Sequence, residues 1–310
     1  MRQVNRMEYI KDTISFKIEH DTVISLGKFD GIHRGHELLL EQMMKKKEDG
    51  LKTVIFTFDV PPRPDQEMGK VLTTNREKEE ICRQLGIDYL IECPFVDEIR
   101  NMEAEDFIRM MAENLHVKCV VVGTDFRFGH ERKGDYRMLL EYAGVYGYEV
   151  VVVDKMQDQG RDISSTYVRE EIQKGNIEKA NELLGYDFFI QGVVQHGRHM
   201  GQAVLGVPTI NLLPPEEKLL PPFGVYVCEI EAKGSVWHGI ADVGQKPTVE
   251  GENPIAVETH ILDFCGDLYG ETVKVSLKKR TRGEMKFDSL EELKCQIMKD
   301  IAFARHYFGS

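Results

Sequence analysis

The sequence predicts two domains of different class: an α/β domain with a Rossmann-like parallel sheet, followed by a small antiparallel β-barrel with a C-terminal helix. Three observations support this division. The 310 residues exceed the usual size of one domain. Apolar runs alternate with helical patterns in the first part of the chain, whereas strand patterns follow one another after residue 185. We therefore expect domains at residues 1–184 and 185–310.

Short apolar runs in the first part have the length and composition of buried strands. They lie at 22–27, 52–58, 88–93, 118–123 and 148–154. Segments with helical spacing separate them, around 36–48, 75–85, 103–115 and 134–146. Buried strands that alternate with helices predict a parallel sheet covered on both faces. Ligands of such sheets bind beyond the carboxyl ends of the strands.

The second part is punctuated by glycine and proline and contains mainly strand patterns. They begin at Phe188, Phe223, Val236, Ile255 and Glu271. One helical pattern, 289–307, closes the chain, and another, 175–187, connects the two parts. Many short strands with turn residues between them predict an antiparallel barrel.

The composition excludes several classes of protein. A hydrophobic content of 42% with 30% charged residues is ordinary for a globular protein, and no apolar stretch approaches the about 20 residues of a membrane span. The N-terminal segment lacks the apolar core of a signal peptide, so we expect a cytoplasmic protein. A net charge of −12 argues against a nucleic-acid binder. The six cysteines are scattered without a C-x-x-C pair, which favours reduced thiols over disulfides or zinc.

The stretch GKFDGIHRGH, residues 27–36, joins the first predicted strand to the first predicted helix. A metal clamp, a phosphate cradle and a plain turn are the three interpretations. Gly31 and Gly35 allow a ligand to approach the backbone, and a helix N-terminus offers N–H groups to an anion. His33 and His36 would project toward the same point. The H-E-x-x-H spacing of a zinc site is absent, so the phosphate cradle is favoured over a loop whose histidines merely cap the helix.

Two further stretches fit the same edge of the sheet. RDISSTYVREEIQ begins a helix with Ser164, Ser165 and Thr166 and places Arg169 one turn later; it is either a plain helix start or a polyphosphate site. VVGTDFRFGHERKGD follows the fourth strand and carries Asp125, Phe126 and Phe128. Its phenylalanines belong either to the core or to the wall of a site for a flat ring.

Together, GKFDGIHRGH, GTDFRFGHERKGD and ISSTYVR resemble the N-terminal half of the bacterial bifunctional FAD synthetases, which combine a riboflavin kinase with an FMN adenylyltransferase. The second part of the chain is similar to their C-terminal half through GVVQHGRHMGQAVLGVPTINL, LPPFGVYV, DVGQKPTVEG and VETHILDFCGDLYG. The seven motifs follow the family's order and cover nearly the whole chain.

The resemblance implies that the first domain is a nucleotidyltransferase, which transfers AMP from ATP to FMN and releases pyrophosphate. The implied catalytic residues are His33, His36 and Arg169. The implied nucleotide- and phosphate-binding residues are Gly27, Phe29, Asp30, Gly31, Gly35, Asp125, Ser164, Ser165 and Thr166. The implied flavin-binding residues are Phe58, Pro62, Phe126 and Phe128. Where the family often has Phe-x-Pro-His-Pro, this chain has Phe58-Asp59-Val60-Pro61-Pro62.

For the second domain the resemblance implies phosphorylation of the riboflavin 5′-hydroxyl. Thr209 and Asn211 lie two apart, so on an extended chain their oxygens face one way and suit a Mg²⁺ ion that bridges ATP phosphates. Glu258, within a predicted strand, is either an exposed residue of a half-buried strand or the general base, and the family match favours the base. His260 shares its face and would orient it.

A glycine-rich phosphate-side loop completes the second predicted site. Its glycines are Gly192, Gly197, Gly201 and Gly206. The spacing from Gly201 to Gly206 is one residue longer than is common in the family. Asp242 stands where asparagine is common, and we expect its charge to face a backbone group or the flavin rather than ATP.

The resemblance thus implies ATP as co-substrate, Mg²⁺ as cofactor, and riboflavin and FMN as the other ligands. It implies no nucleic acid or membrane partner and a monomer or weak oligomer. Two alternatives remain. A single-activity nucleotidyltransferase would use the barrel only to bind flavin. A non-catalytic flavin-binding regulator would be expected to lack His36 or Glu258, both of which are present.

Overall fold

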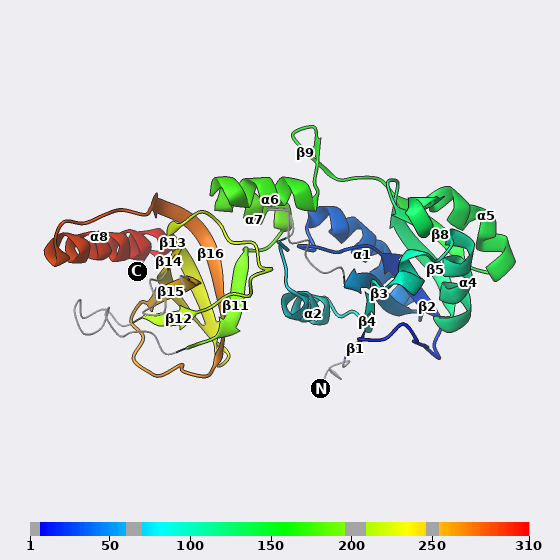
Figure 1. The fold of residues 1–310 in the computed structure, drawn as a ribbon, viewed down its shortest axis with the longest axis horizontal. Coiled ribbons are helices and arrows are strands. Elements are labelled where there is room, and N and C mark those ends of the chain that lie inside the picture. Colours follow the sequence, from blue (N-terminus) through cyan, green and yellow to red (C-terminus); the bar gives the residue numbers. More distant parts are fainter. Residues whose placement is uncertain (1–6, 60–69, 196–208, 246–253, 310) are drawn as a thin grey trace. The chain divides into compact units, whose positions relative to one another are not determined.

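A computed structural model describes residues 7–59, 70–195, 209–245 and 254–309 of the chain (Figure 1). The chain divides into two compact units, Met1–Ser165 and Thr166–Ser310. Helix α6 (Ser165–Lys174) begins at this division, and α7 (Ile177–Leu184) follows it. The domain boundary expected after residue 184 stays a prediction.

A six-stranded parallel sheet forms the centre of the first unit. Its strands are β1 (Glu8–Lys11), β2 (Thr22–Leu26), β3 (Lys52–Asp59), β4 (Tyr89–Pro94), β5 (Val117–Gly123) and β8 (Glu149–Val153), in the order β1-β4-β3-β2-β5-β8. All of β2 is buried, as expected for a strand with both faces covered. The predicted parallel sheet is confirmed, and β1 is an edge strand that the sequence did not indicate.

Helices cover both faces of this sheet. They are α1 (Arg34–Glu48), α2 (Asn75–Gln84), the short α3 (Asp97–Arg100), α4 (Ala104–Asn114) and α5 (Tyr136–Tyr146). Phe107 and Met111 of α4 and Leu139 of α5 share one core cluster with Ile24 and Phe56 of the sheet. The chain runs from β2 to β3 and then to β4 in one direction across the sheet, and afterwards crosses to β5 on the other side of β2. Because such crossovers are right-handed, α1 and α2 lie on the face opposite to α4 and α5.

The strand order creates a switch point beside β2. The chain leaves β2 toward β3, whereas the crossover that follows β4 enters β5 on the other side of β2. Loops that follow β2 and β5 therefore diverge and leave room for a ligand at the carboxyl edge of the sheet. Small hairpins complete the unit: β6 (Arg127–Phe128) with β7 (Gly134–Asp135) around the short helix η2 (His130–Arg132), and β9 (Gln157–Asp158) with β10 (Arg161–Asp162).

The second unit is a nearly closed antiparallel barrel. Its strands are β11 (Phe189–Val193), β12 (Ile210–Leu212), β13 (Gly224–Ala232), β14 (Ser235–Gln245), β15 (Ile255–Ile261) and β16 (Thr272–Gly283), in the order β11-β16-β13-β14-β15-β12. A bridge between Gln195 and Asn211 brings the two edge strands together. The predicted barrel is confirmed, and Figure 1 shows its strands beside the final helix, α8 (Leu290–Phe308).

Helix α8 is fixed to the barrel by apolar contacts and by ion pairs, of which Arg282–Asp300 involves a buried carboxylate. Ile301 and Ala304 form a cluster with Val225, Val227 and other residues of the barrel. Arg282 of β16 donates two hydrogen bonds from Nε, at 3.2 and 3.1 Å, and one from Nη2, at 2.8 Å, to the buried carboxylate of Asp300. A forked arginine–carboxylate contact fixes orientation as well as distance, so it sets the angle at which α8 lies on the barrel. In the part of the chain that is described, no helix combines the length and apolarity that crossing a bilayer requires.

A buried carboxylate ties α1 to the amino edge of the parallel sheet. Asp88 accepts hydrogen bonds from the backbone N–H and the hydroxyl of Thr53, at 3.0 and 2.9 Å, and the Lys47 ammonium lies 2.8 Å away. Burial alone would raise the pKa of Asp88, but these hydrogen bonds outweigh it and hold the pKa below its usual range. The carboxylate therefore stabilises the folded chain in its ionised form.

Replacing this carboxylate should weaken the fold in a pH-dependent way. Asp88→Asn should lower the free energy of unfolding at pH 7 by about 1–3 kcal/mol, because buried hydrogen bonds to a charged group are lost. Since folding lowers the pKa, the contribution is complete above the unfolded-state pKa of about 3.9 and is lost as the pH falls through the folded-state value. The difference between the two proteins in urea denaturation should therefore shrink below about pH 4.

Asp97→Asn is the matched control, because its carboxylate is exposed and pairs with Arg100 within one short helix at 2.7 Å. It should change stability little at either pH. A difference for Asp88→Asn that is the same at pH 7 and at about pH 3 would contradict the assignment.

Candidate active sites

The loop between β2 and α1 holds a strained backbone. Phe29 and Ile32 have positive φ angles of 46° and 37°, and Gly31 between them has φ 86°. A positive φ is unusual for any side chain and is an outlier for a β-branched residue such as isoleucine. Phe29 and Ile32 are 1% and 3% exposed, so their burial fixes the conformation. Strain of this kind persists only where surrounding contacts determine the backbone, and it is typical of ligand sites.

Hydrogen bonds from two distant segments hold this loop. Oδ1 of Asp30 accepts from the backbone N–H groups of Leu72 and Thr73, at 2.7 and 3.2 Å. The Thr73 hydroxyl in turn accepts from the Gly31 N–H at 3.1 Å, and the Ser165 hydroxyl donates to the Asp30 carbonyl at 2.8 Å. The Asp30 side chain thus shapes the loop, and Thr73 is a site residue that no sequence motif indicated.

The two histidines of the loop form one stacked pair. His33 is the N-cap residue of α1, His36 lies in its first turn, and their ring centroids are 3.9 Å apart at 24°. Phe29 lies against His36 at 4.9 Å. Burial lowers the pKa of His33 to about 4. Burial, and then the neighbouring His33, lower the pKa of His36 well below its usual value.

Both imidazoles are therefore neutral at pH 7. Among the described residues, the buried Nδ1 atoms of His33 and His36 have no hydrogen-bond partner. A buried N–H without an acceptor is costly, so the cheaper tautomer carries its proton on Nε2. The pair then offers N–H donors rather than positive charges at the start of α1, where the helix already presents free backbone N–H groups.

Gly35 brings the serine-rich segment against the same helix end. A Cβ atom at Gly35 would lie 2.8 Å from the Ile163 carbonyl oxygen and 3.0 Å from Nδ1 of His33. The missing side chain of Gly35 thus allows the Ile163 backbone to approach the start of α1 closely. Gly27 is different, because a Cβ atom there would make only ordinary contact with the Phe29 ring at 3.5 Å.

Helix α6 begins within the predicted phosphate motif. Ser164 precedes the helix, Ser165 is its first residue and Thr166 is exposed. Arg169 lies one turn after Ser165 on the same side of α6. These hydroxyls and the Arg169 guanidinium therefore lie at the start of α6, and their role in binding phosphate stays a prediction.

The predicted flavin-binding phenylalanines belong to one aromatic cluster at the carboxyl ends of β3, β4 and β5. Phe128 is buried and stacks on Phe126 at 5.5 Å, while Phe58 contacts Phe95 at 5.4 Å. Phe107 of α4 joins the two pairs at 6.3 and 5.7 Å. Phe126, Phe58 and Phe95 are half-buried, so each keeps an exposed part at this edge. Pro62 lies outside the described residues.

Asp125, also predicted for this edge, is exposed. Its carboxylate lies 3.0 Å from the Lys155 ammonium. The sequence indicated Asp125 from its motif, whereas Lys155 lies in the segment that enters the β9–β10 hairpin and carries no motif.

The predicted kinase residues meet on neighbouring strands of the barrel. The Thr209 hydroxyl donates to Oε1 of Glu258 at 2.5 Å. Asn211 of β12 lies directly opposite Glu258 of β15, and Asp242 of β14 lies opposite it on the other side. Directly opposed residues of antiparallel strands point to the same face. Thr209, Asn211, Glu258 and Asp242 therefore share one face of the barrel.

Of the remaining predicted kinase residues, the structure describes His260 and Gly192. His260 follows Glu258 by two positions and shares its face. Gly192 lies on β11 opposite Val273, and a Cβ atom there would only touch the Leu212 side chain at 3.7 Å. Gly197, Gly201 and Gly206 lie outside the described residues.

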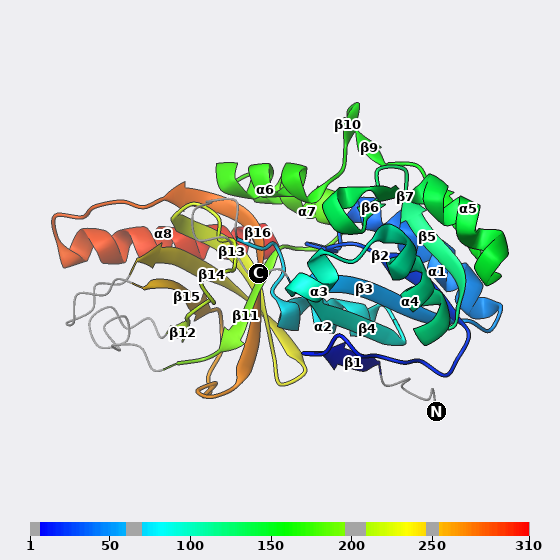
Figure 2. The ribbon, with the colours of Figure 1, turned by 45° about the vertical axis from the view of Figure 1, so that its right-hand side comes forward.

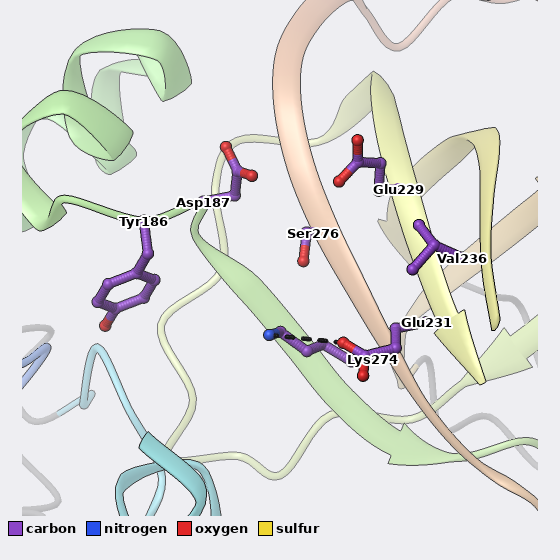
Figure 3. A pocket seen from close by; sticks show the side chains of 7 residues that line it. All are labelled: Tyr186, Asp187, Glu229, Glu231, Val236, Lys274 and Ser276. Atoms are coloured by element: carbon purple, nitrogen blue, oxygen red, sulfur yellow. Dashed lines mark ion pairs between the residues drawn. The ribbon is translucent and has the colours of Figure 1, made fainter. Parts of the chain in front are cut away.

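A pocket of about 220 Å³ on the barrel contains none of these predicted residues (Figure 3). Its lining residues are Tyr186, Asp187, Glu229, Glu231, Val236, Lys274 and Ser276. Lys278 bridges Asp187 and Glu229 at 2.6 and 2.8 Å, and Lys274 lies over the Phe189 ring at 4.6 Å. Neighbouring lysines thus offset much of the acidic charge of the pocket, which gives it no strong preference for a charged ligand.

Comparisons with known proteins match both parts of the chain. The family description FAD synthetase matches residues 15–167, and the description riboflavin kinase matches residues 184–308. The bifunctional riboflavin kinase/FMN adenylyltransferase of Escherichia coli K12 is 37% identical over 93% of each chain. The protein of the same description from Bacillus subtilis is 33% identical over 93% of each chain.

The chain belongs to the bifunctional riboflavin kinase/FMN adenylyltransferase family. It carries both catalytic domains of that family and is an enzyme of FMN and FAD formation, with ATP as co-substrate. Its fold is shared over nearly the full length with a crystal structure from Streptococcus pneumoniae that is described as a macrolide-efflux protein. That structure is 31% identical, has a TM-score of 0.85, and the alignment covers 96% of this chain and 98% of the other.

A methyl group at Gly35 should impair the adenylylation of FMN and not the phosphorylation of riboflavin. In Gly35→Ala the new Cβ atom would clash with the Ile163 carbonyl and the His33 ring, so the serine-rich segment and the imidazole must both shift. FAD formation from FMN should fall by about 10–100-fold, because small displacements in a transferase site are costly. Riboflavin phosphorylation, measured in the same preparation, should be unchanged.

Gly144→Ala in α5 is the matched control, because a Cβ atom there meets nothing within 4 Å. It should leave both rates unchanged and raise stability by up to about 1 kcal/mol. Full FAD formation by Gly35→Ala would show that the close approach at Ile163 has no part in catalysis.

Proposed function

We propose that adenylyl transfer from ATP to FMN takes place at the carboxyl edge of the parallel sheet, beside His33 and His36. The observation that carries this proposal is the stacked, neutral imidazole pair at the N-terminus of α1, next to the switch point of the sheet. Neutral N–H donors and backbone N–H groups bind phosphate without bringing in a compensating positive charge.

In the proposed reaction an oxygen of the FMN phosphate attacks the α-phosphorus of ATP. The bond from this phosphorus to the β-bridging oxygen breaks, and pyrophosphate leaves. Negative charge gathers on the phosphate oxygens as the bonds exchange, and His33 and His36 donate hydrogen bonds to them. From the family pattern we assign Ser164, Thr166 and Arg169 to the pyrophosphate. Ser165 and Asp30 hold the loop in place, which the bond between them supports.

The aromatic cluster of this edge is the proposed wall for the flavin ring. Phe58 and Phe126 are half-buried, so their exposed parts remain free to contact a flat apolar surface. Offset or edge contacts between aromatic rings contribute about 0.5–1.5 kcal/mol each beyond burial. Phe95 joins this proposed wall through its contact with Phe58.

In the barrel we propose that Glu258 accepts the proton of the riboflavin 5′-hydroxyl. The 5′-oxygen of riboflavin then attacks the γ-phosphorus of ATP as this proton leaves. ADP is then the leaving group. The Thr209 hydroxyl, at 2.5 Å from Glu258, and the buried Asn211 beside it supply the hard oxygen atoms that a Mg²⁺ ion prefers. When bound, Mg²⁺ neutralises charge on the ATP phosphates. Asn211 and Thr209 would hold it, and Thr209 also fixes the Glu258 carboxylate.

The extents of the two domains, residues 1–184 and 185–310, remain part of this proposal. So do a cytoplasmic location, a monomer or weak oligomer, and the absence of nucleic-acid and membrane partners. The net charge of −12 supports the absence of a nucleic-acid partner, because polyanions are bound by basic faces.

The histidine assignment is tested by supplying riboflavin and MgATP to His36→Ala. FMN should accumulate without conversion to FAD, because the donor to the reacting phosphate is lost while the barrel is unchanged. Chromatography of the two flavins gives both activities in one run. His20→Ala, at an exposed position, is the control and should produce FAD at the normal rate. Normal FAD output from His36→Ala would refute the assignment.

The kinase base is tested by Glu258→Gln, which keeps the size of the side chain and its hydrogen bond with Thr209 but removes the basicity. Riboflavin phosphorylation should fall by about 10²–10⁴-fold, the usual contribution of general-base catalysis. Conversion of added FMN to FAD should persist. Glu231→Gln, an exposed carboxylate on β13, is the control and should keep both activities. If Glu258→Gln phosphorylates riboflavin within a few-fold of the wild-type rate, Glu258 is a structural residue.

A further inference from the structure

One lysine joins two segments that flank the proposed adenylyl-transfer site. The Lys155 ammonium lies 3.0 Å from Oδ2 of Asp125 and 3.1 Å from Oδ2 of Asp162. Asp125 belongs to the loop that leaves β5, and Asp162 lies on β10, at the end of the β9–β10 hairpin. The three residues, called the Lys155 bridge here, thus connect the carboxyl end of β5 to the strand that leads into α6.

The Asp162 end of the bridge is itself well fixed. Its Oδ1 accepts a hydrogen bond from the Gln157 side chain at 2.9 Å, and Gln157 is its partner across the hairpin. The next residue, Ile163, donates its N–H to the Met156 carbonyl at 2.9 Å and is buried. Displacement of Asp162 would therefore move Ile163, whose carbonyl is the group that meets Gly35 of α1.

The hairpin begins and ends beside the Lys155 bridge. Figure 2 shows β9 and β10 projecting from the body of the first unit. Gln159 and Gly160 turn the chain with positive φ angles of 48° and 81°, a conformation of tight two-residue hairpins. A two-stranded hairpin of this length is marginally stable by itself. Its position is thus set by contacts at its base, where Lys155 and Asp162 lie.

The charges of the bridge suit this role. The hydrogen bonds from Lys155 to Asp125 and Asp162 raise the pKa of Lys155, and those from Gln157 and Lys155 lower the pKa of Asp162, so both Lys155 and Asp162 are charged at pH 7. Lys155 is 40% exposed and Asp125 is 68% exposed, so the ion pairs contribute little to global stability. Their effect is local: they fix one segment relative to another.

We infer that Lys155 is a positioning residue of the adenylyltransferase: by bridging Asp125 and Asp162 it holds Ile163 and the Ser164–Ser165 start of α6 against the His33–His36 pair. The inference rests on the proposed function of that pair. Without Lys155, the carboxylates of Asp125 and Asp162 lose their shared cation at an edge that must accept the polyanion ATP. The segment would then move, and the local potential would disfavour phosphate.

The test compares Lys155→Met with wild-type protein in both activities. The kcat/KM for ATP in FAD formation should fall by about 2–30-fold, the range expected from two exposed ion pairs. The KM for FMN, the rate of riboflavin phosphorylation and the thermal midpoint should stay unchanged. Lys155→Arg keeps the charge and much of the reach and should recover most of the loss.

Lys118→Met is the matched control. Lys118 is similarly exposed and lies 3.9 Å from Asp21 at the amino edge of the same sheet, away from the proposed site. It should have wild-type kinetics.

A double-mutant cycle with Asp162→Asn separates positioning from direct binding. If Lys155 acts through Asp162, the double variant should lose little more than Lys155→Met alone. If the two losses multiply, Lys155 contacts ATP directly and the positioning role is wrong. Wild-type kinetics of Lys155→Met would also overturn it, and so would a parallel loss of riboflavin phosphorylation or of thermal stability.

His36→Ala, run alongside, distinguishes a failure of this inference from a failure of the proposed function. Loss of FAD formation in His36→Ala with wild-type behaviour of Lys155→Met refutes the Lys155 bridge alone. Normal FAD formation in His36→Ala refutes the site on which the inference rests.

Discussion

The first site depends on the conformation of one short loop, and the Asp30 carboxylate is the group that holds it. Phe29, Gly31 and Ile32 all have positive φ, which a free loop would not maintain. Asp30 binds two successive backbone N–H groups at Leu72 and Thr73, and a carboxylate with two such donors is a strong anchor. Because of this anchor, α1 starts at a fixed point and presents its two histidines in one stack.

The barrel relies on a different constraint, namely strand register. Asn211, Glu258 and Asp242 form a row across three neighbouring strands only because β12, β15 and β14 pair as they do. A slip by one residue would turn each of these side chains to the other face. Two carboxylates directly opposite each other repel, so Asp242 makes the row more acidic than the asparagine common in the family would. A divalent cation beside Thr209 and Asn211 would reduce that repulsion.

The sequence predicted the sheet because short apolar runs alternate with helical patterns, and the barrel because strand patterns follow one another between glycine and proline residues. It missed β1 and β12, which are four and three residues long and carry no periodicity. It identified His33, His36 and Glu258 because each lies in a local motif. It missed Thr73, Phe95 and Lys155, because their roles come from contacts with residues far along the chain. Asp242 was noticed as unusual, but only the register shows that it faces Glu258.

The two proposed sites would bind phosphate in opposite ways, and this agrees with a chain whose net charge is −12. In the proposed site of the parallel sheet, phosphate would meet neutral imidazoles and the N-terminus of α1, so attraction would come from dipoles aimed at the ligand. In the barrel, the conspicuous groups are oxygen atoms, which repel phosphate unless a cation lies between them. The site in the parallel sheet requires that its N–H donors be held in place, because a dipole attracts phosphate only while it points toward it. That requirement explains why so many contacts of the first unit, from Asp30 to the Ile163 carbonyl, serve to fix backbone rather than to contact ligand.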